Sequence, residues 1–278
     1  MVTMKETYGV KLPDLDLHDL VGKLIVIEGT DGVGRSTQMG MLKEWLEQQG
    51  RAVLDTGLTR SGLVGKSIRR AKEGHTLGRL TLTLFYATDF ADRLENEIVP
   101  ALRAGFVVLT DRYIYSLMAR AMVRGLDPAW VRNIHSFALK PDAVFYLRIG
   151  VNDLIPRAVF QRGFDYWESG MDLFSTEDMY DSFGKYQGAL LQQFDHLAEE
   201  FNFEVIDARP DPKVIFEQLR EGILRVLLRS DGTSSPALAI VPPSGAAAPE
   251  EGPVEIPAQP MRRASDLAAK AEESRAKS

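Results

Sequence analysis

The stretch from Gly29 to Thr37 has the residue types and spacing of a phosphate-binding loop. Gly29-x-x-x-x-Gly34-Arg35-Ser36 matches the P-loop pattern G-x-x-x-x-G-K-[ST], except that arginine replaces the lysine. Glycines let the backbone turn tightly, and the backbone N–H groups at a helix N-terminus bind anions. The predicted phosphate-binding residues are Gly29, Thr30, Asp31, Gly32, Val33, Gly34, Arg35, Ser36 and Thr37. The alternative is an ordinary strand–turn–helix connection.

Two oxygen-bearing side chains near this loop are predicted to bind Mg²⁺. Ser36 would offer its hydroxyl, and Asp111, at the end of a third apolar run, would offer its carboxylate directly or through water. Asp111 has a structural alternative as a strand-end cap or a salt bridge to Arg112. Arg35 keeps the positive charge of the missing lysine but presents a planar fork instead of a compact ammonium.

Four more arginines are candidates for contacts with phosphates. Arg60 and Arg112 follow two apolar runs and are predicted to hold an acceptor phosphate, because a guanidinium binds phosphate with two hydrogen bonds. Arg157 and Arg162 lie in a polar segment that would act as a lid over the donor phosphates. A solvated, charged surface is the alternative for each of them.

Three aromatic residues at helical spacing, Phe85, Tyr86 and Phe90, are candidates for stacking on a base. An aromatic stripe of this kind is more typical of a protein core. We expect Phe85 to be core, and we assign Tyr86 and Phe90 to substrate binding.

The apolar runs that would position these residues alternate with helical patterns. They lie at about residues 24–27, 52–56, 106–110, 143–149 and 203–206. Helices are expected over about residues 35–49, 66–72, 79–103 and 114–123. A further helix is expected to start after an N-cap at Asp127, and a long helical stretch is expected to end at about residue 200. This alternation predicts an α/β fold in which helices cover both faces of a parallel sheet. Ligands bind at the carboxyl ends of such strands, where the P-loop, Arg60 and Asp111 all fall.

Composition limits the functions that this chain of 278 residues can have. Without cysteine it has no disulfide, thiol nucleophile or cysteine metal site, and four scattered histidines argue against a histidine metal cluster. The net charge of −6 argues against binding to nucleic acid or to an anionic membrane. No apolar run reaches 18 residues and no signal peptide precedes the domain, so we expect a cytoplasmic protein.

Three regions are expected along the chain. Residues 1–21 form a leader that packs loosely, and residues 22–229 form one domain with a lid at about 155–172. Residues 230–278 are rich in proline and alanine and are predicted to be a disordered tail.

Two motifs together resemble the thymidylate kinase family. Residues 28–38 read EGTDGVGRSTQ against the family's E-G-x-D-G-x-G-K-S-T-Q, and residues 111–116 read DRYIYS against D-R-Y-x-x-S. The resemblance implies a five-stranded P-loop NTPase fold and phosphoryl transfer to a nucleoside monophosphate, most of all dTMP. It further implies ATP as co-substrate, a requirement for Mg²⁺, and a homodimer. It also implies that Asp31 binds the sugar hydroxyl, that Tyr86 stacks on the base, and that Arg157 and Arg162 act from the lid.

The departures from the family pattern fall mostly in the acceptor site. Phe90 replaces the base-contacting arginine, Arg120 falls in the motif that screens the sugar, and the lid's D-R-x-E reads DYWE at residues 165–168. We assign Arg120 to substrate binding on this basis. Two other hypotheses follow: a kinase for a different acceptor, and a non-catalytic nucleotide-binding protein on the same fold.

Overall fold

The computed structural model describes residues 5–10, 16–75, 77–161 and 163–230. The predicted tail after residue 230 lies outside these ranges. Within the described ranges, every helix is too short or too polar to cross a membrane.

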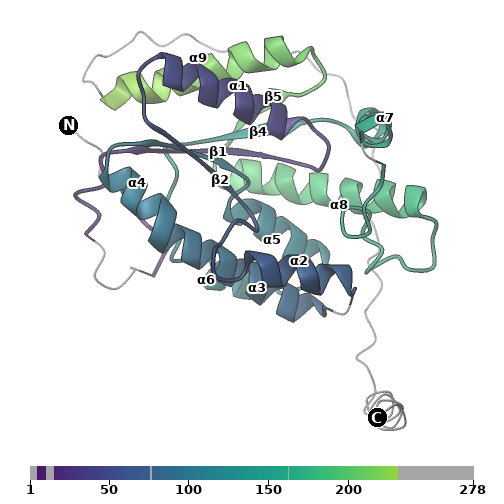
Figure 1. Ribbon diagram of the computed structural model, residues 1–278. Helices are drawn as coiled ribbons and strands as arrows, with labels where there is room; N and C mark the ends of the chain where they lie inside the picture. Colours follow the sequence, from purple (N-terminus) through teal and green to yellow (C-terminus); the bar gives the residue numbers. More distant parts are fainter. Residues whose placement is uncertain (1–4, 11–15, 76, 162, 231–278) are drawn as a thin grey trace.

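A five-stranded parallel sheet forms the centre of the molecule (Figure 1), as the sequence predicts. Its strands are β1 (Lys23–Gly29), β2 (Val53–Gly57), β3 (Val107–Asp111), β4 (Ala143–Arg148) and β5 (Glu204–Asp207), in the order β2-β3-β1-β4-β5. Strand β1 lies in the middle because it is apolar on both faces, with Leu24, Ile25, Val26 and Ile27 fully buried. The P-loop therefore starts from the centre of the sheet.

Helices cover the two faces of the sheet, and alternate residues of β1 contact different layers. Ile25 and Ile27 pack in the core with α1 and α9, whereas Leu24 and Val26 pack in the larger core with α3, α5 and α8. The helices are α1 (Arg35–Gln48), α2 (Gly65–Glu73), α3 (Arg79–Arg93), the π-helix η1 (Leu94–Ile98), α4 (Val99–Arg103), α5 (Ile114–Val123), α6 (Pro128–Ile134), α7 (Val151–Gln161), α8 (Met179–Glu200) and α9 (Pro212–Ser230).

The structure differs from the sequence-based expectation in three helices. The helix expected over 79–103 is interrupted by η1, a π-turn that shifts the helical phase before α4. Helix α7 occupies the first part of the expected lid, although it contains Pro156. Helix α9, which packs against α1 and β4, was not predicted from the sequence pattern. The N-cap at Asp127 is confirmed, since its Oδ1 accepts from Trp130 N at 2.7 Å.

The described part of the leader docks on the domain by specific contacts. Tyr8 N donates to Ala138 O at 3.1 Å, and the hydroxyls of Tyr8 and Tyr115 are 2.5 Å apart. Lys5 pairs with Asp142, whose carboxylate also accepts from Leu24 N at 2.7 Å. Residues 5–10 are thus attached to the start of β1 and to α5.

Two helical glycines make the packing of α9 testable. A Cβ at Gly222 would lie 2.3 Å from Phe145 Cε1, whereas a Cβ at Gly40 of α1 would meet nothing within 4 Å. We expect Gly222→Ala to lower the free energy of unfolding by about 1–3 kcal/mol through overpacking. Gly40→Ala is the matched control and should raise it by about 0.5–1 kcal/mol. Urea unfolding of both variants checks this, and a Gly222→Ala protein as stable as Gly40→Ala would contradict the packing of α9 on β4.

Candidate active site

The P-loop connects the end of β1 to the start of α1, and its glycines are needed there. Gly34 has φ 103°, which favours glycine, and Gly29 has φ 148° with no room for a side chain. A Cβ at Gly29 would lie 2.7 Å from Leu147 O. Among the described residues, the backbone N–H groups of Gly32, Val33 and Gly34 have no protein acceptor. These donors are therefore available for an anion.

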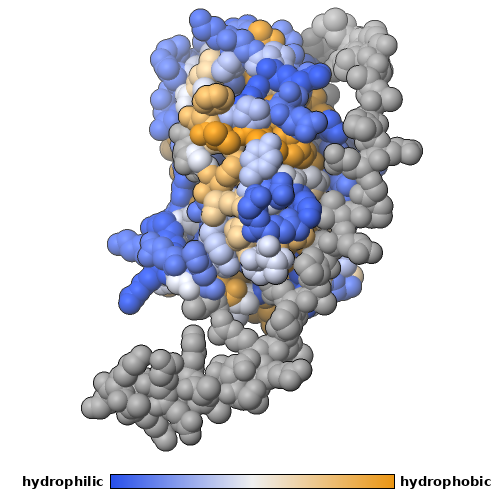
Figure 2. All heavy atoms as spheres, turned by 90° about the vertical axis from the view of Figure 1, so that its right-hand side faces the viewer, coloured by the Kyte–Doolittle hydropathy of each residue, from blue (hydrophilic) through white to orange (hydrophobic). Residues whose placement is uncertain are grey.

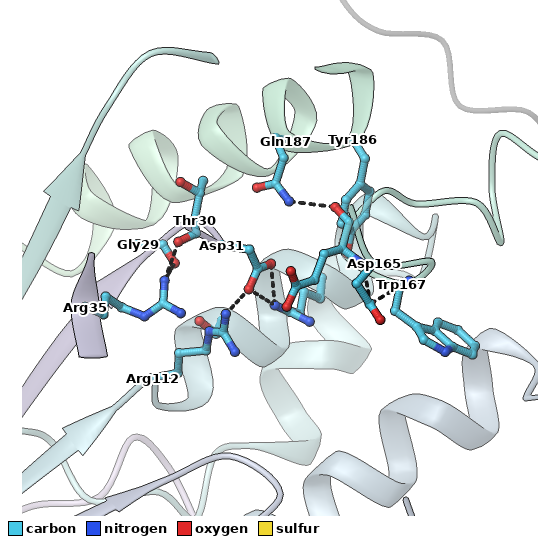
Figure 3. Close-up of polar contacts among 12 residues, drawn as sticks. Gly29, Thr30, Asp31, Arg35, Arg112, Asp165, Trp167, Tyr186 and Gln187 are labelled. Atoms are coloured by element: carbon cyan, nitrogen blue, oxygen red, sulfur yellow. Dashed lines mark hydrogen bonds and ion pairs between the residues drawn. The ribbon is translucent and has the colours of Figure 1, made fainter. Parts of the chain in front are cut away.

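Arg35 folds back under the loop in which it lies (Figure 3). Its Nη1 donates to Gly29 O at 2.5 Å and to Thr30 O, and its Nε donates to Asp111 Oδ1 at 2.6 Å. The side chain is only 7% exposed. A guanidinium thus takes the position of a P-loop lysine, and its charge is balanced by the carboxylate at the end of β3.

The two predicted metal ligands come from neighbouring elements. Ser36 is in the first turn of α1, and Asp111 ends β3, which pairs with β1 in a register that aligns Asp111 with Ile27. Hydroxyl and carboxylate oxygens are ligands that suit Mg²⁺. No cluster of three or more His, Asp or Glu side chains that could hold a metal occurs in the part of the chain that the structure describes. Magnesium binding by Ser36 and Asp111 stays a prediction.

Arg112 has a strained backbone that directs its side chain towards the P-loop. Its φ is 71°, in the left-handed region that costs a non-glycine residue about 1–2 kcal/mol. Neighbouring groups hold it: Arg112 N donates to Ile27 O at 3.0 Å, and Thr110 Oγ1 donates to Arg112 O at 2.7 Å. Strain of this kind is typical of functional sites.

Glu28, the first residue of the motif over residues 28–38, has a structural role that the motif itself does not indicate. Its buried carboxylate accepts from Tyr113 N at 2.8 Å, from Ser116 N at 3.2 Å and from Ser116 Oγ at 2.6 Å. A side chain of β1 thus caps the N-terminus of α5, which has no cap of its own. Burial raises the pKa of Glu28, against the opposing effect of these hydrogen bonds and of Arg35. An acidic residue at the end of an apolar strand was the available sequence signal.

The Asp31 carboxylate binds two arginines, one in the loop before α5 (Arg112) and one within α5 (Arg120) (Figure 3). The carboxylate is 2% exposed and pairs with Arg112 Nη2. Its two oxygens also accept from Arg120 Nη2 at 3.0 and 2.7 Å. Two guanidinium groups thus lie beside the P-loop, where Glu168 also acts electrostatically on Arg120. Guanidinium groups are donors that suit an anionic ligand.

The predicted base-binding residues separate into two places. Tyr86 and Arg120 line one narrow cleft between α3 and α5, together with Leu82, Leu117 and Arg124. Phe90 lies in the core instead, with no exposed surface, and its ring contacts Tyr113 edge-on with centroids 4.9 Å apart. The helical stripe is therefore part cleft and part core.

Arg60 lies at the carboxyl end of β2, beside the end of β3. Its Nη1 donates to Asp55 Oδ1 at 3.1 Å, and its side chain is about half exposed. A Cβ at Gly57 would lie 3.5 Å from both Arg60 Nε and Asp111 Cβ, so the arginine passes close to the strand ends.

A second cavity, of about 290 Å³, adjoins the P-loop on the α9 side. Gly32, Gly34, Gln38, Arg157 and Pro212 are among the residues that line it, and Gln38 Nε2 donates to Pro212 O at 2.8 Å. Arg157 donates to Ala208 O at 2.7 Å and to Arg209 O at 3.0 Å, so it fixes the loop after β5. Arg162 lies outside the described residues.

Helix α7 presents apolar side chains to solvent. Val159 is 48% exposed and Phe160 is 89% exposed. Figure 2 faces the side of the molecule that carries α7 and shows hydrophobic residues (orange) among hydrophilic ones (blue).

The rest of the lid is closed against α2 in this structure. Trp167 is buried, and its Nε1 donates to Lys72 O at 3.0 Å. Tyr166 stacks on His75 with centroids 3.8 Å apart, and Gln187 Nε2 donates to Glu168 O at 2.7 Å. The residues that replace the family's lid motif therefore connect the lid with α2 and α8 (Figure 3).

Comparison with known proteins finds one family and many relatives. The family model for thymidylate kinase matches residues 27–219. The probable thymidylate kinase 2 of Saccharolobus solfataricus is 38% identical over 202 residues, which cover 72% of this chain and 94% of the relative. The probable thymidylate kinase of Thermococcus kodakarensis is 33% identical over 205 residues, with 70% and 94% covered. The thymidylate kinase of Clavibacter sepedonicus is 40% identical over 135 residues, with 46% and 64% covered.

The cap that Glu28 provides can be tested through its pH dependence. Burial raises the folded-state pKa of Glu28 above the ordinary value of 4.5. The carboxyl therefore contributes stability that is fully present below about pH 4.5 and is lost as the pH rises through the folded-state pKa. In Glu28→Gln, the amide oxygen can accept from Tyr113 N and Ser116 N and the amide nitrogen can donate to Ser116 Oγ, all without a charge. Its stability relative to wild type should therefore increase from pH 4.5 to pH 7.5.

Urea unfolding at several pH values measures this difference. Glu28→Ala is the companion variant; it leaves three donors without an acceptor and should cost about 2–5 kcal/mol. A difference between wild type and Glu28→Gln that does not change with pH would contradict the buried, titrating carboxylate.

Proposed function

The chain belongs to the thymidylate kinase family, and we propose that it transfers the γ-phosphoryl group of ATP to a nucleoside monophosphate, dTMP above all. The observation that carries this proposal is the arrangement of the P-loop between two unequal sites. On one side is the cavity that Arg157 borders, and on the other is the Asp31 carboxylate with Arg112 and Arg120. A donor and an acceptor would approach each other across the loop.

The donor nucleotide fits the first site. The N–H groups of Gly32, Val33 and Gly34 would bind the ATP phosphates, and the cavity by Arg157 and Pro212 would receive the base. Mg²⁺ would be held by Ser36 and Asp111, and it would neutralise part of the charge on the phosphates. Arg35 uses Nη1 and Nε to bind Gly29, Thr30 and Asp111, and its Nη2 donors would contact the transferring phosphoryl group.

The acceptor nucleotide fits the second site. Arg60 and Arg112 follow adjacent strands and would bind the acceptor phosphate from two sides. Asp31 would accept a hydrogen bond from the sugar hydroxyl. Tyr86, on the wall of the α3–α5 cleft, would contact the base beside Arg120. Phosphoryl transfer depends mainly on such positioning and charge neutralisation, so no strong general base is needed.

The wider setting of the activity is part of the same proposal. The family resemblance favours a homodimer that works in the cytoplasm. Light scattering of the purified chain would test whether it is a dimer. The lid arginines Arg157 and Arg162 would approach the donor when the substrates are bound.

An acceptor panel tests the function. With ATP and Mg²⁺, we expect ADP release that depends on the acceptor, with the highest kcat/KM for dTMP among dTMP, dUMP, UMP, CMP, AMP, GMP and thymidine. The altered positions Phe90 and Arg120 make the ranking of the other acceptors informative. Tight ATP binding without acceptor-dependent ADP release would refute the kinase assignment.

A second prediction concerns the arginine of the P-loop. Arg35→Ala removes the charge at the phosphate cradle and should lower kcat by about 100-fold or more, as for other preorganised charge-stabilising groups. Arg35→Lys restores a charge and should retain much of the activity. Arg51→Ala, which removes an exposed arginine just after α1, is the control with unchanged kinetics. Steady-state assays compare the three, and a fully active Arg35→Ala protein would contradict the role of Arg35.

A further inference from the structure

The loop between β2 and α2, which carries Arg60, has a backbone conformation that its own residues disfavour. Thr59 has φ 60°, and a β-branched residue is rarely found in the left-handed region. Helix α2 starts close behind it, since a Cβ at Gly65 would lie 2.7 Å from Thr59 O. A contact from outside the loop must therefore hold this conformation.

Asp89 of α3 provides that contact. Its Oδ2 accepts from Thr59 N at 3.0 Å, and its Oδ1 accepts from Ser61 N at 3.1 Å. The two amides belong to the residues on either side of Arg60, so one carboxylate fixes the backbone both before and after the arginine. Asp89 is fully buried, and the contact is shielded from water.

The partner of Asp89 indicates that stability alone does not explain this arrangement. Arg93 Nε donates to Asp89 Oδ2 at 3.1 Å, and both side chains are completely buried. Within the described residues, Nη1 and Nη2 of Arg93 have no hydrogen-bond partner. A buried ion pair with unsatisfied donors is an inefficient way to stabilise a fold, although it can specify one conformation.

A second carboxylate of α3 extends the same support. Ser61 Oγ donates to Asp92 Oδ2 at 2.5 Å, one helical turn from Asp89. The Arg60 side chain lies on the other side of the loop, near Gly57 and the end of β3. The backbone is thus bound to α3, while Arg60 Nε lies near Gly57 and Nη1 donates to Asp55 Oδ1 of β2 at 3.1 Å.

We propose that Asp89 is a positioning residue for phosphate binding: by holding the amides of Thr59 and Ser61, it sets where Arg60 meets the acceptor phosphate. This inference rests on the proposed function, in which Arg60 binds that phosphate. It assigns Asp89 no contact with substrate. Asp89 would affect acceptor binding through the position of Arg60, so its substitution should change the KM for the acceptor and not that for ATP.

The decisive experiment is a double-mutant cycle. In Asp89→Asn, the side-chain amide presents a donor to one of the two loop N–H groups, so the KM for dTMP should rise about tenfold or more while the KM for ATP changes less than about twofold. In the Arg60→Ala background, Asp89→Asn should add nothing, since the residue through which it acts is gone. Additive effects, or equal changes in both KM values, would overturn the proposal.

Companion variants separate positioning from damage to the fold. Thr59→Gly removes the backbone strain and should restore part of the dTMP affinity of Asp89→Asn. Asp89→Glu keeps the charge opposite Arg93 but moves the oxygens, so it replaces Asp89→Asn if that variant does not fold, with the same expected KM pattern. Asp195→Asn, which removes the carboxylate paired with Arg148 on the surface, is the matched control with unchanged KM values.

Hydrogen exchange distinguishes a failure of this inference from a failure of the proposed function. If no nucleoside monophosphate is a substrate of the wild type, the proposed function fails. The positioning role is then decided by the amides themselves: exchange at Thr59 and Ser61 should be faster in Asp89→Asn than in wild type and unchanged in Asp195→Asn. Equal exchange in wild type and Asp89→Asn would overturn the role.

Discussion

The site depends on the contact between the Glu28 carboxylate and the N-terminus of α5. Glu28 is a buried residue of β1 next to Gly29 of the P-loop, and it accepts from Tyr113 and Ser116 at the start of the helix. This contact joins the P-loop, which would bind the donor, to the segment that carries Arg112 before α5 and Arg120 within it. Because the carboxylate is buried and fully hydrogen-bonded, the relative position of the two elements is tightly fixed.

Two other carboxylates, of the buried Asp31 and the partly buried Asp111, organise the remaining cations in a similar way. Asp31 holds Arg112 and Arg120, and Asp111 holds Arg35. Each pair keeps a guanidinium near the carboxyl ends of the strands while its charge is balanced in the absence of phosphate. A phosphate that arrives there competes with a carboxylate for an arginine that is already oriented, so less side-chain freedom is lost on binding.

The lid connects the donor side of the molecule with α2. Arg157 fixes the loop after β5, and Trp167 reaches α2 by its bond to Lys72 O. Tyr166 replaces the arginine of the family's lid motif and Trp167 occupies its variable position, and both provide aromatic contact surface. This lid is therefore held closed partly by aromatic packing, which needs no phosphate to form.

The sequence by itself determined the parallel sheet, the P-loop and the edge where Arg60, Asp111 and Arg112 meet. Those features follow from local patterns: apolar runs of strand length, glycines at fixed spacing, and the rule that parallel strands end at one edge. The family resemblance followed from the same local motifs, and the comparisons confirm it.

Only the tertiary structure decided which partner each charged residue takes. The aromatic stripe of α3 did not reveal that Tyr86 faces a cleft while Phe90 lies in the core. The two residues are one helical turn apart, and the packing of α5 against α3 decides which of them stays accessible. Likewise, Glu28 and Asp89 bind amides 85 and about 30 positions away along the chain. A hydrogen bond between distant segments depends on how the elements pack, and no spacing within one segment encodes it.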